Sequence, residues 1–327
     1  MSAKYWQAIN KALHGEMERD PTVVIFGQNV AESGGTFGST RGLLETFGPD
    51  RVRDTPISEL ASVGAAVGAA TMGLRPVIEI VFSDFLLIAA DQLVNQAAKL
   101  RYFTGGATRV PLVVKTGVGI DGGLGGQHSN SFEALWAHIP GLKVVWPSTP
   151  ADADGLLRAA IRDPDPVIFF ESVGRYAARG PDPTGEPVPI GLARTVTEGD
   201  DVTLVTYGTA VDAVAEAAAA LAEEGVSAEV LDLRTIQPWD AGTVMESVRR
   251  TGRAIVVHDA VRSFGVGAEV AAEISERCFD RLAAPVLRLG AHRVPSPQVR
   301  QLEAEILPRA REVVDAARAL VRHPARP

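Results

Sequence analysis

Short, unbroken runs of apolar residues recur along the first half of the chain, separated by helical or glycine-rich segments. The first run, residues 23–26, is continuous rather than alternating and ends at Gly27. An unbroken run of this length is typical of a strand buried on both faces of a parallel sheet. Strands that alternate with helices predict a doubly wound α/β domain over residues 1–180, whose ligands bind beyond the carboxyl ends of the strands. The further runs cover residues 76–82, 111–115, 142–146 and 166–170.

A proline-rich stretch separates this domain from a second one. Four prolines fall within residues 180–189, which favours an extended linker at 181–189 over a packed element. Beyond it, apolar runs again alternate with helical segments, which predicts a second, smaller α/β domain over residues 190–327. Its predicted strands are 202–206, 228–233 and 254–258, and its predicted helices are 210–224, a segment after Asp240, and 302–322.

Composition narrows the class of protein. The 327 residues are 46% hydrophobic and 22% charged, as in an ordinary globular protein of two domains. A net charge of -8 argues against generic binding to nucleic acid or to an anionic membrane. The single cysteine, Cys278, excludes an internal disulfide and a cysteine-based metal site. The N-terminus lacks the apolar core of a signal peptide, and no segment has roughly 18 unbroken apolar residues, so we expect a cytoplasmic protein without a membrane span.

Residues 54–59, Asp-Thr-Pro-Ile-Ser-Glu, place a carboxylate at the start of a helix rich in small residues. Pro56 drives the preceding residue out of the helical conformation, and Ser58 is a good N-cap. Glu59 then has two interpretations. In the first it complements the helix dipole, which the spacing alone favours, and in the second it points at a bound molecule.

A second candidate lies after the third apolar run, where residues 117–126 contain six glycines. The stretch has neither the lysine of a phosphate-binding loop nor the spacing of a dinucleotide fingerprint. Glycine here indicates a backbone that passes close to another chain or to a ligand. Next to it, His128 lies beside Gln127 and Ser129 and is either a structural histidine or an acid–base group.

Two other kinds of site are not indicated. The remaining histidines lack the helical spacing of two histidines with a third ligand, which argues against a transition-metal site. The motif Gly-x-Ser-x-Gly is absent from the sequence, which argues against a hydrolase of the common α/β type.

Five strings, in order along the chain, decide between these interpretations. Together they resemble the β subunit of thiamine-diphosphate-dependent 2-oxo acid dehydrogenases, the first and decarboxylating component of those complexes. The resemblance runs over most of the chain, and the pair Gln127–His128 is similar to the pyruvate and acetoin types rather than to the branched-chain type. The strings are Asp54 to Glu59, Phe82-Ser83-Asp84-Phe85, Gly125-Gly126-Gln127-His128-Ser129, Ala137 to Val145, and Asp232-Leu233-Arg234-Thr235.

This resemblance implies a pyrimidine-binding domain followed by a transketolase C-terminal-like domain. It makes Glu59 the catalytic acid, which shares a proton with a pyrimidine ring nitrogen of thiamine diphosphate and needs a buried carboxyl group for that role. It places Phe85 against the pyrimidine face, with Ile57 lining the same pocket. His128 becomes an active-site group near the reacting carbon, oriented by Gln127 and Ser129. The implied reaction decarboxylates a 2-oxo acid, or cleaves acetoin, and passes the acyl group to a lipoyl acceptor.

The family's motif for the diphosphate and magnesium, Gly-Asp-Gly followed later by paired asparagines, does not occur in the chain. The resemblance therefore implies a separate α subunit that binds the diphosphate and Mg²⁺, and an α2β2 assembly. The second domain would build the contact between β subunits and dock a lipoyl acyltransferase core. Some relatives also hold a structural potassium ion on backbone carbonyls, which corresponds here to Leu112, Ala160, Ile161, Asp163 and Asp165.

Two stretches depart from the family pattern. Gln28 and Asn29 stand where the family has an acidic pair, so neutral amides replace groups associated with a link between two active sites. Residues 291–295 replace a stretch that normally contains an acid, which weakens the expectation of docking to a multienzyme core. Two alternatives stay open: a biosynthetic thiamine enzyme subunit with a non-lipoyl acyl acceptor, and a non-catalytic scaffold for the α subunit. The choice of 2-oxo acid is not predicted, because one methylene changes selectivity by only about 1–3 kcal/mol.

Overall fold

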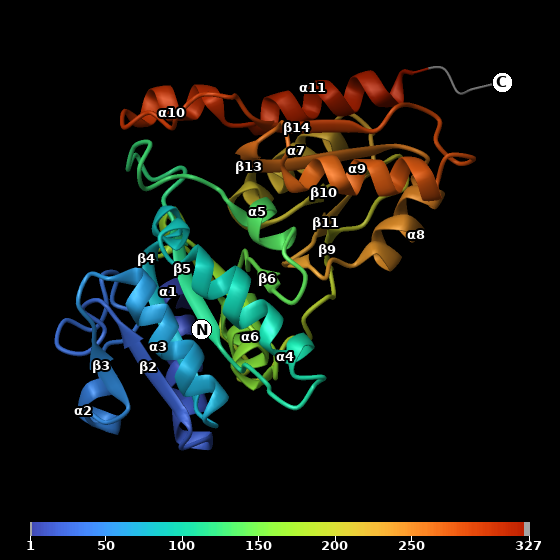
Figure 1. Cartoon of the computed structure of the whole chain (residues 1–327). Helices are drawn as coiled ribbons and strands as arrows, with labels where there is room; N and C mark the ends of the chain where they lie inside the picture. Colours follow the sequence, from blue (N-terminus) through green and yellow to red (C-terminus); the bar gives the residue numbers. More distant parts are fainter. Residues whose placement is uncertain (1, 324–327) are drawn as a thin grey trace. The chain divides into compact units, whose positions relative to one another are not determined.

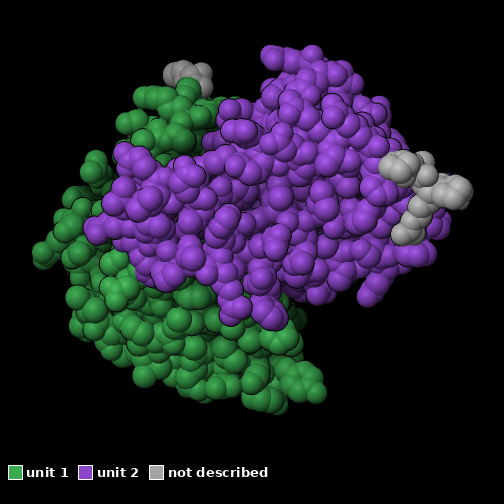
Figure 2. Space-filling view, turned by 90° about the horizontal axis from the view of Figure 1, so that it is seen from above, with its two compact units in different colours: residues 1–119, 127–190 green, residues 120–126, 191–327 purple. Residues whose placement is uncertain are grey.

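The computed structural model describes residues 2–323, and the chain forms two compact units. Unit 1 consists of residues 1–119 and 127–190, and unit 2 of residues 120–126 and 191–327 (Figure 2). The short segment 120–126 therefore belongs to unit 2, although it lies in the first half of the chain. Each unit has an apolar core of its own.

The strands that unit 1 contributes to its sheet are parallel and lie in the order β6-β7-β5-β4-β2-β3. Figure 1 labels β2 to β6 among them. Each continuous apolar run forms one of these strands, and the predicted α/β fold is confirmed. The carboxyl ends of parallel strands meet at one edge, where Gly27, Asp54 and Phe82 end three neighbouring strands. The strands are β2 (Val23–Gly27), β3 (Val52–Asp54), β4 (Arg75–Phe82), β5 (Val113–Val118), β6 (Lys143–Val145) and β7 (Val167–Ser172).

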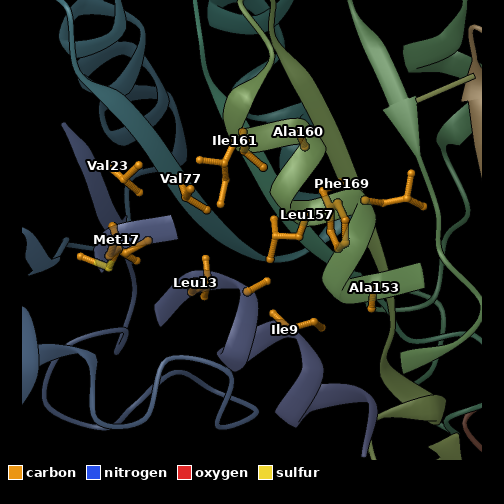
Figure 3. Packing of buried hydrophobic residues seen from close by; sticks show 14 of the residues in the cluster. Ile9, Leu13, Met17, Val23, Val77, Ala153, Leu157, Ala160, Ile161 and Phe169 are labelled. Atoms are coloured by element: carbon orange, nitrogen blue, oxygen red, sulfur yellow. The ribbon is translucent and has the colours of Figure 1, made fainter. Parts of the chain in front are cut away.

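Two helices, α1 (Tyr5–Arg19) and α6 (Pro150–Arg162), pack against each other and against one face of this sheet. Figure 3 shows Leu13 of α1 and Leu157 of α6 in one cluster with Val77 and Phe169 from the strands. The next residue of β7, Phe170, points to the opposite face and is also buried, so both faces are covered. The other helical segments are α2 (Leu43–Phe47), α3 (Glu59–Thr71), η1 (Ser83–Leu87), η2 (Gln92–Ala97), α4 (Ala98–Phe103), α5 (Glu133–Ala137) and η3 (Val173–Arg175).

A cluster of charged side chains is buried within this sheet. Lys115 on β5 lies between two carboxylates, with Nζ 2.7 Å from Glu79 Oε2 and 3.1 Å from Glu171 Oε1. All three side chains are 5% exposed or less. Burial by itself lowers the pKa of Lys115, but the charges and hydrogen bonds of the two glutamates outweigh it and raise that pKa. The lysine therefore stays charged inside the protein between the two glutamates, while burial and the charge of Glu79 raise the pKa of Glu171.

Unit 2 contains a five-stranded sheet in the order β14-β13-β10-β11-β9, in which β9 is antiparallel to β11 and the other pairs are parallel. Leu221 of α7 and Val313 of α11 are buried in one cluster with Leu204 of β10. The elements of this unit are β9 (Arg194–Thr197), β10 (Val202–Thr206), η4 (Gly208–Ala210), α7 (Val211–Glu223), β11 (Ala228–Asp232), β12 (Thr235–Gln237), α8 (Ala241–Thr251), β13 (Ala254–Val261), α9 (Val266–Arg277), β14 (Leu287–Ala291), α10 (Arg300–Ile306) and α11 (Ala310–Val321).

One local expectation about the helices is wrong, and another holds only for the position of the residue. The single helix expected at 302–322 is split into α10 and α11, because Pro308 lacks the N–H that a continuous helix needs and forces Leu307 into an extended conformation. Ser58 occupies the N-cap position of α3, but its side chain forms no capping hydrogen bond. The predicted start of α3 at Glu59 is confirmed.

The stretch expected to be an unpacked linker is partly packed. Pro181 ends the short strand β8 (Arg179–Pro181), which pairs with β1 (Ser2–Lys4) in an antiparallel two-stranded sheet. The Val188 N–H donates to the carbonyl oxygen of Gly155 at 2.9 Å, and a side chain at Gly155 would collide with Val188. Prolines thus set an extended backbone here, and that backbone lies on unit 1.

His258 on β13 predicts an acid sensitivity of folding. The side chain is fully buried, and burial lowers its pKa to about 4, while a hydrogen bond to the Ala260 carbonyl partly opposes this shift. An unfolded histidine titrates near pH 6.5, so the unfolded chain binds the extra proton first. The contribution of His258 to stability is complete above about pH 6.5 and falls by about 3 kcal/mol as the pH drops towards 4.

Urea unfolding at pH 7 and at pH 4.5 measures this loss. A His258→Asn variant is expected to lose less stability than the parent between the two pH values. The variant His292→Asn removes an exposed histidine of the same unit and is expected to keep the parent's pH dependence. Identical losses in the parent and in His258→Asn would contradict the assignment.

Candidate active site

Glu59 begins α3 at the carboxyl edge of the sheet in unit 1. Only 5% of the residue is exposed, and Gln28 Nε2 donates a hydrogen bond of 3.2 Å to Glu59 Oε1. Gln28 follows β2 and the segment leading to Glu59 follows the neighbouring strand β3, so the parallel pairing brings the two side chains together. The Thr55 N–H also donates to the Gly27 carbonyl at 2.9 Å. The side chain of Glu59 is therefore held at the N-terminus of α3, at the carboxyl edge of the sheet.

Phe82, Phe85 and His128 form an aromatic group at the ends of neighbouring strands. The imidazole of His128 meets both phenyl rings edge to face, with centroids 4.6 Å from Phe82 and 5.7 Å from Phe85. Ser83 Oγ donates to the Asn130 carbonyl at 2.6 Å, which ties the segment that carries His128 to η1. Phe82 was not predicted from the sequence as a site residue, although it is the first residue of the string 82–85.

Not all predicted site residues come together in this chain. Ile57 is 82% exposed, and Gln127 is exposed beside the half-buried His128. Within residues 2–323, no hydrogen bond or ring contact joins Glu59 to the aromatic group of His128. The chain thus offers a buried carboxylate, a separate imidazole on an aromatic support, and two exposed side chains next to them.

Residues 1–178 match the family described as transketolase, pyrimidine binding domain, and residues 191–313 match transketolase, C-terminal domain. The chain is 44% identical to the acetoin:2,6-dichlorophenolindophenol oxidoreductase subunit beta of Cupriavidus necator, with 95% of each chain covered. It is 42% identical to the pyruvate dehydrogenase E1 component subunit beta-2, mitochondrial, of Oryza sativa subsp. japonica, with 95% of this chain and 84% of the relative covered. The chain belongs to the β subunits of the thiamine-diphosphate-dependent 2-oxo acid dehydrogenases.

This β subunit is also 45% identical to the 2-oxoisovalerate dehydrogenase subunit beta of Bacillus subtilis, with 89% of this chain and 90% of the relative covered. Relatives named for three substrates are thus similar to the same degree, and the identities do not single out one. A solved structure described as a split gene transketolase, inactive beta4 tetramer, matches with a TM-score of 0.79 over 97% of this chain and 98% of that one. At 22% identity it shows the fold alone.

Membership of the family confirms the resemblance read from the five strings and the two expected domain types. It implies dependence on thiamine diphosphate, and the names of the relatives as β subunits imply an α-subunit partner. The residues present fit the pyrimidine half of that cofactor, since Glu59 is a buried carboxylate and Phe85 an aromatic ring at the same edge of the sheet. Within residues 2–323, no three His, Cys, Asp or Glu side chains are grouped to hold a metal ion.

The five residues predicted to hold potassium lie beside β5 and at the C-terminal end of α6; they are Leu112, Ala160, Ile161, Asp163 and Asp165. The carbonyl oxygens of Ile161 and Asp163 both accept from Arg75 Nη1, at 2.8 and 3.2 Å. Those of Leu112 and Ala160 accept from backbone N–H groups. A helix C-terminus favours a cation, and the guanidinium of Arg75 already supplies one. A potassium ion at this place would share its acceptors with that side chain.

Proposed function

We propose that this chain is the β subunit of a heteromeric thiamine-diphosphate-dependent 2-oxo acid dehydrogenase of the pyruvate or acetoin type. The assembled enzyme decarboxylates a 2-oxo acid, or cleaves acetoin, and passes the acyl group to a lipoyl acceptor. The observation that best supports this is the buried carboxylate of Glu59, held by Gln28 at the carboxyl edge of the sheet. Burying an acid costs free energy, so packing alone does not favour a glutamate at this position.

Glu59 is the residue proposed to hold a proton for the cofactor. When bound, thiamine diphosphate supplies the carbon nucleophile and the electron sink of the reaction. Glu59 would share its proton with a nitrogen of the bound pyrimidine ring, while Gln28 holds Oε1 and fixes the direction of the carboxyl group. The burial of Glu59 excludes water, which strengthens such a contact. Phe85 offers an apolar ring for the pyrimidine to pack against.

His128 is proposed to move a proton during acyl transfer. Imidazole gives and takes protons near neutral pH, and the edge-to-face contacts with Phe82 and Phe85 fix the plane of this ring. The residue is half-buried, so one side of the ring faces solvent or an incoming acceptor. Gln127, exposed next to it, is proposed to orient the ring or the acceptor.

The partners proposed for this chain follow from the part of the cofactor that it can bind and the part that it cannot. The chain has a carboxylate for the pyrimidine ring but no motif for the diphosphate, so an α subunit that binds Mg²⁺ and an α2β2 assembly are proposed. Docking to a lipoyl acyltransferase core and the potassium site stay predictions. The cytoplasmic location also stays a prediction. None of the helices described in residues 2–323 has the length and apolar character that a membrane crossing needs.

A biosynthetic subunit that transfers the acyl group to a non-lipoyl acceptor is the second candidate. It is favoured by the changed stretch 291–295, which replaces a stretch that normally contains an acidic residue. Side-by-side assays with a lipoyl domain and with free aldehydes as acceptors separate the two candidates. A strong preference for the lipoyl domain would remove the second.

Assembly with an α subunit tests the proposed function. The purified chain alone is expected to show no turnover of pyruvate or acetoin with a dye as electron acceptor. With an α subunit from the same genome that carries the diphosphate motif, turnover is expected and should require both thiamine diphosphate and Mg²⁺. Tight binding of the cofactor and turnover by the chain alone would contradict the proposal.

A further inference from the structure

The glycine-rich segment before His128 is held by residues far away in the sequence. Residues 120–126 belong to unit 2, and His128 follows only two positions after them. The segment therefore connects a backbone fixed within unit 2 to an imidazole proposed to take part in the reaction. The contacts that hold residues 120–126 therefore affect the position of the backbone just before His128.

A single buried carboxylate makes the central contacts with this segment. Glu303 on α10 is 1% exposed, and its carboxylate accepts hydrogen bonds from the Asp121 N–H at 3.1 Å and the Gly123 N–H at 2.8 Å. Ser296 Oγ donates a third bond at 2.9 Å. A buried charge is tolerated when it is hydrogen-bonded in this way, and the two backbone donors would otherwise lack an acceptor inside the protein.

Further contacts surround this carboxylate. Arg309 Nη2 pairs with the Asp121 carboxylate at 3.1 Å, and Arg300 Nη2 donates to the Gly122 carbonyl at 3.4 Å. Gly123 has a φ of 69°, and a Cβ there would lie 2.8 Å from Arg300 Cγ, so the close approach requires glycine. Asp121 adopts the same left-handed region with a φ of 61°, which the surrounding bonds must sustain.

We infer that Glu303 is a positioning residue for His128. Its carboxylate fixes two N–H groups of the glycine-rich segment and thereby sets the point from which the chain enters Gln127 and His128. The inference rests on the proposed function for its catalytic consequence, while the anchoring is a property of the fold. It also gives a role to residues 296–309, next to the stretch 291–295 that departs from the family: within unit 2 they hold the glycine-rich segment that precedes Gln127 and His128 in the chain.

Hydrogen exchange in the Glu303→Gln variant tests the anchor. The amide group keeps the size of the side chain but loses the charge and one acceptor, so the amides of Asp121 and Gly123 are expected to exchange about tenfold faster or more. The matched control is Glu305→Gln, which neutralises an exposed glutamate on the same helix and is expected to leave exchange of these amides unchanged. Equal exchange in the two variants would overturn the inference.

A double-mutant cycle with His128→Ala separates positioning from general destabilisation. In the α-containing assembly with a lipoyl acceptor, Glu303→Gln is expected to lower kcat about tenfold. Combined with His128→Ala, it is expected to cause no further loss, because the group that it positions is gone. Losses that multiply would overturn the inference. Should Glu303→Gln fail to fold, Ser296→Ala removes a single donor to the same carboxylate. It is expected to lower kcat less than Glu303→Gln and, again, to cause no further loss when combined with His128→Ala.

A readout that needs no turnover keeps the inference distinct from the proposed function. If the parent assembly is inactive with every 2-oxo acid and with acetoin, the proposed function fails. The Hε1 resonance of His128 then decides the anchor: it is expected to shift in Glu303→Gln and to stay unchanged in Glu305→Gln. An unchanged resonance in both variants would overturn the positioning role.

Discussion

Glutamine in place of Glu59 is expected to lower kcat of the assembled enzyme by at least about a hundredfold, the usual loss when a positioned proton-transfer group is removed. The new amide has the size of the carboxyl group, and its oxygen can still accept the bond that Gln28 donates, so the fold is expected to persist. It carries no acidic proton to share with a ring nitrogen. Turnover of a 2-oxo acid with a dye acceptor, measured with the α subunit present, gives kcat.

The control for this experiment is Glu45→Gln, which removes the same charge from an exposed position on α2 and is expected to leave kcat unchanged. Calorimetric binding of thiamine diphosphate to the assembly adds a second measurement, and Glu59→Gln is expected to bind the cofactor more weakly. If Glu59→Gln turns over as fast as Glu45→Gln, the catalytic role of Glu59 is wrong. The chain would then be a non-catalytic scaffold for its α partner.

Methionine in place of Lys115 is expected to lower the free energy of unfolding by about 3–5 kcal/mol, the loss found when one partner of a buried ion pair is removed. The substitution retains most of the side-chain volume, so the loss arises from charge and hydrogen bonding. Glu79 and Glu171 would be left buried without the ammonium group between them, and Ser39 Oγ would lose the bond that Lys115 donates at 3.1 Å. Urea unfolding of the chain at pH 7 measures the change.

Lys99→Met provides the comparison for this second effect. Lys99 is only partly buried on α4, and its ammonium group donates to Asn95 at 3.0 Å on an exposed surface. Its replacement is expected to change the free energy of unfolding by no more than about 0.5 kcal/mol. Equal losses in the two variants would show that the buried cluster contributes no more than a lysine at the surface.

The sheet of unit 1 could be predicted because a parallel strand with two buried faces appears in the sequence as a continuous apolar run. Strand ends were less well predicted. The run at 111–115 corresponds to β5 (Val113–Val118), since Thr116 and Gly117 continue the pairing with β7 although neither is a large apolar residue. The strand β3 was not predicted, because three residues carry too little pattern to be recognised.

Residues of the candidate site could be predicted only where they stand in a short, recognisable string of the sequence. Glu59 and His128 stand in strings that resemble the family, whereas the hydrogen bond from Gln28 to Glu59 depends on the pairing of β2 with β3. The register that sets Lys115 opposite Glu79 is likewise a property of the folded sheet. In the sequence, Glu303 looks like an ordinary surface charge in a helix. The folded structure shows that it is buried and that it accepts hydrogen bonds from residues 120–126.

The membership of residues 120–126 in unit 2 bears on how relatives of this chain can be recombined. A chimera joined at residue 190 would combine the glycine-rich segment of one parent with the Ser296, Glu303 and Arg309 equivalents of another. A crossover at the domain boundary therefore separates the glycine-rich segment from the residues of unit 2 that contact it. Hybrid genes should therefore exchange residues 120–126 together with residues 191–327, so that both come from the same parent.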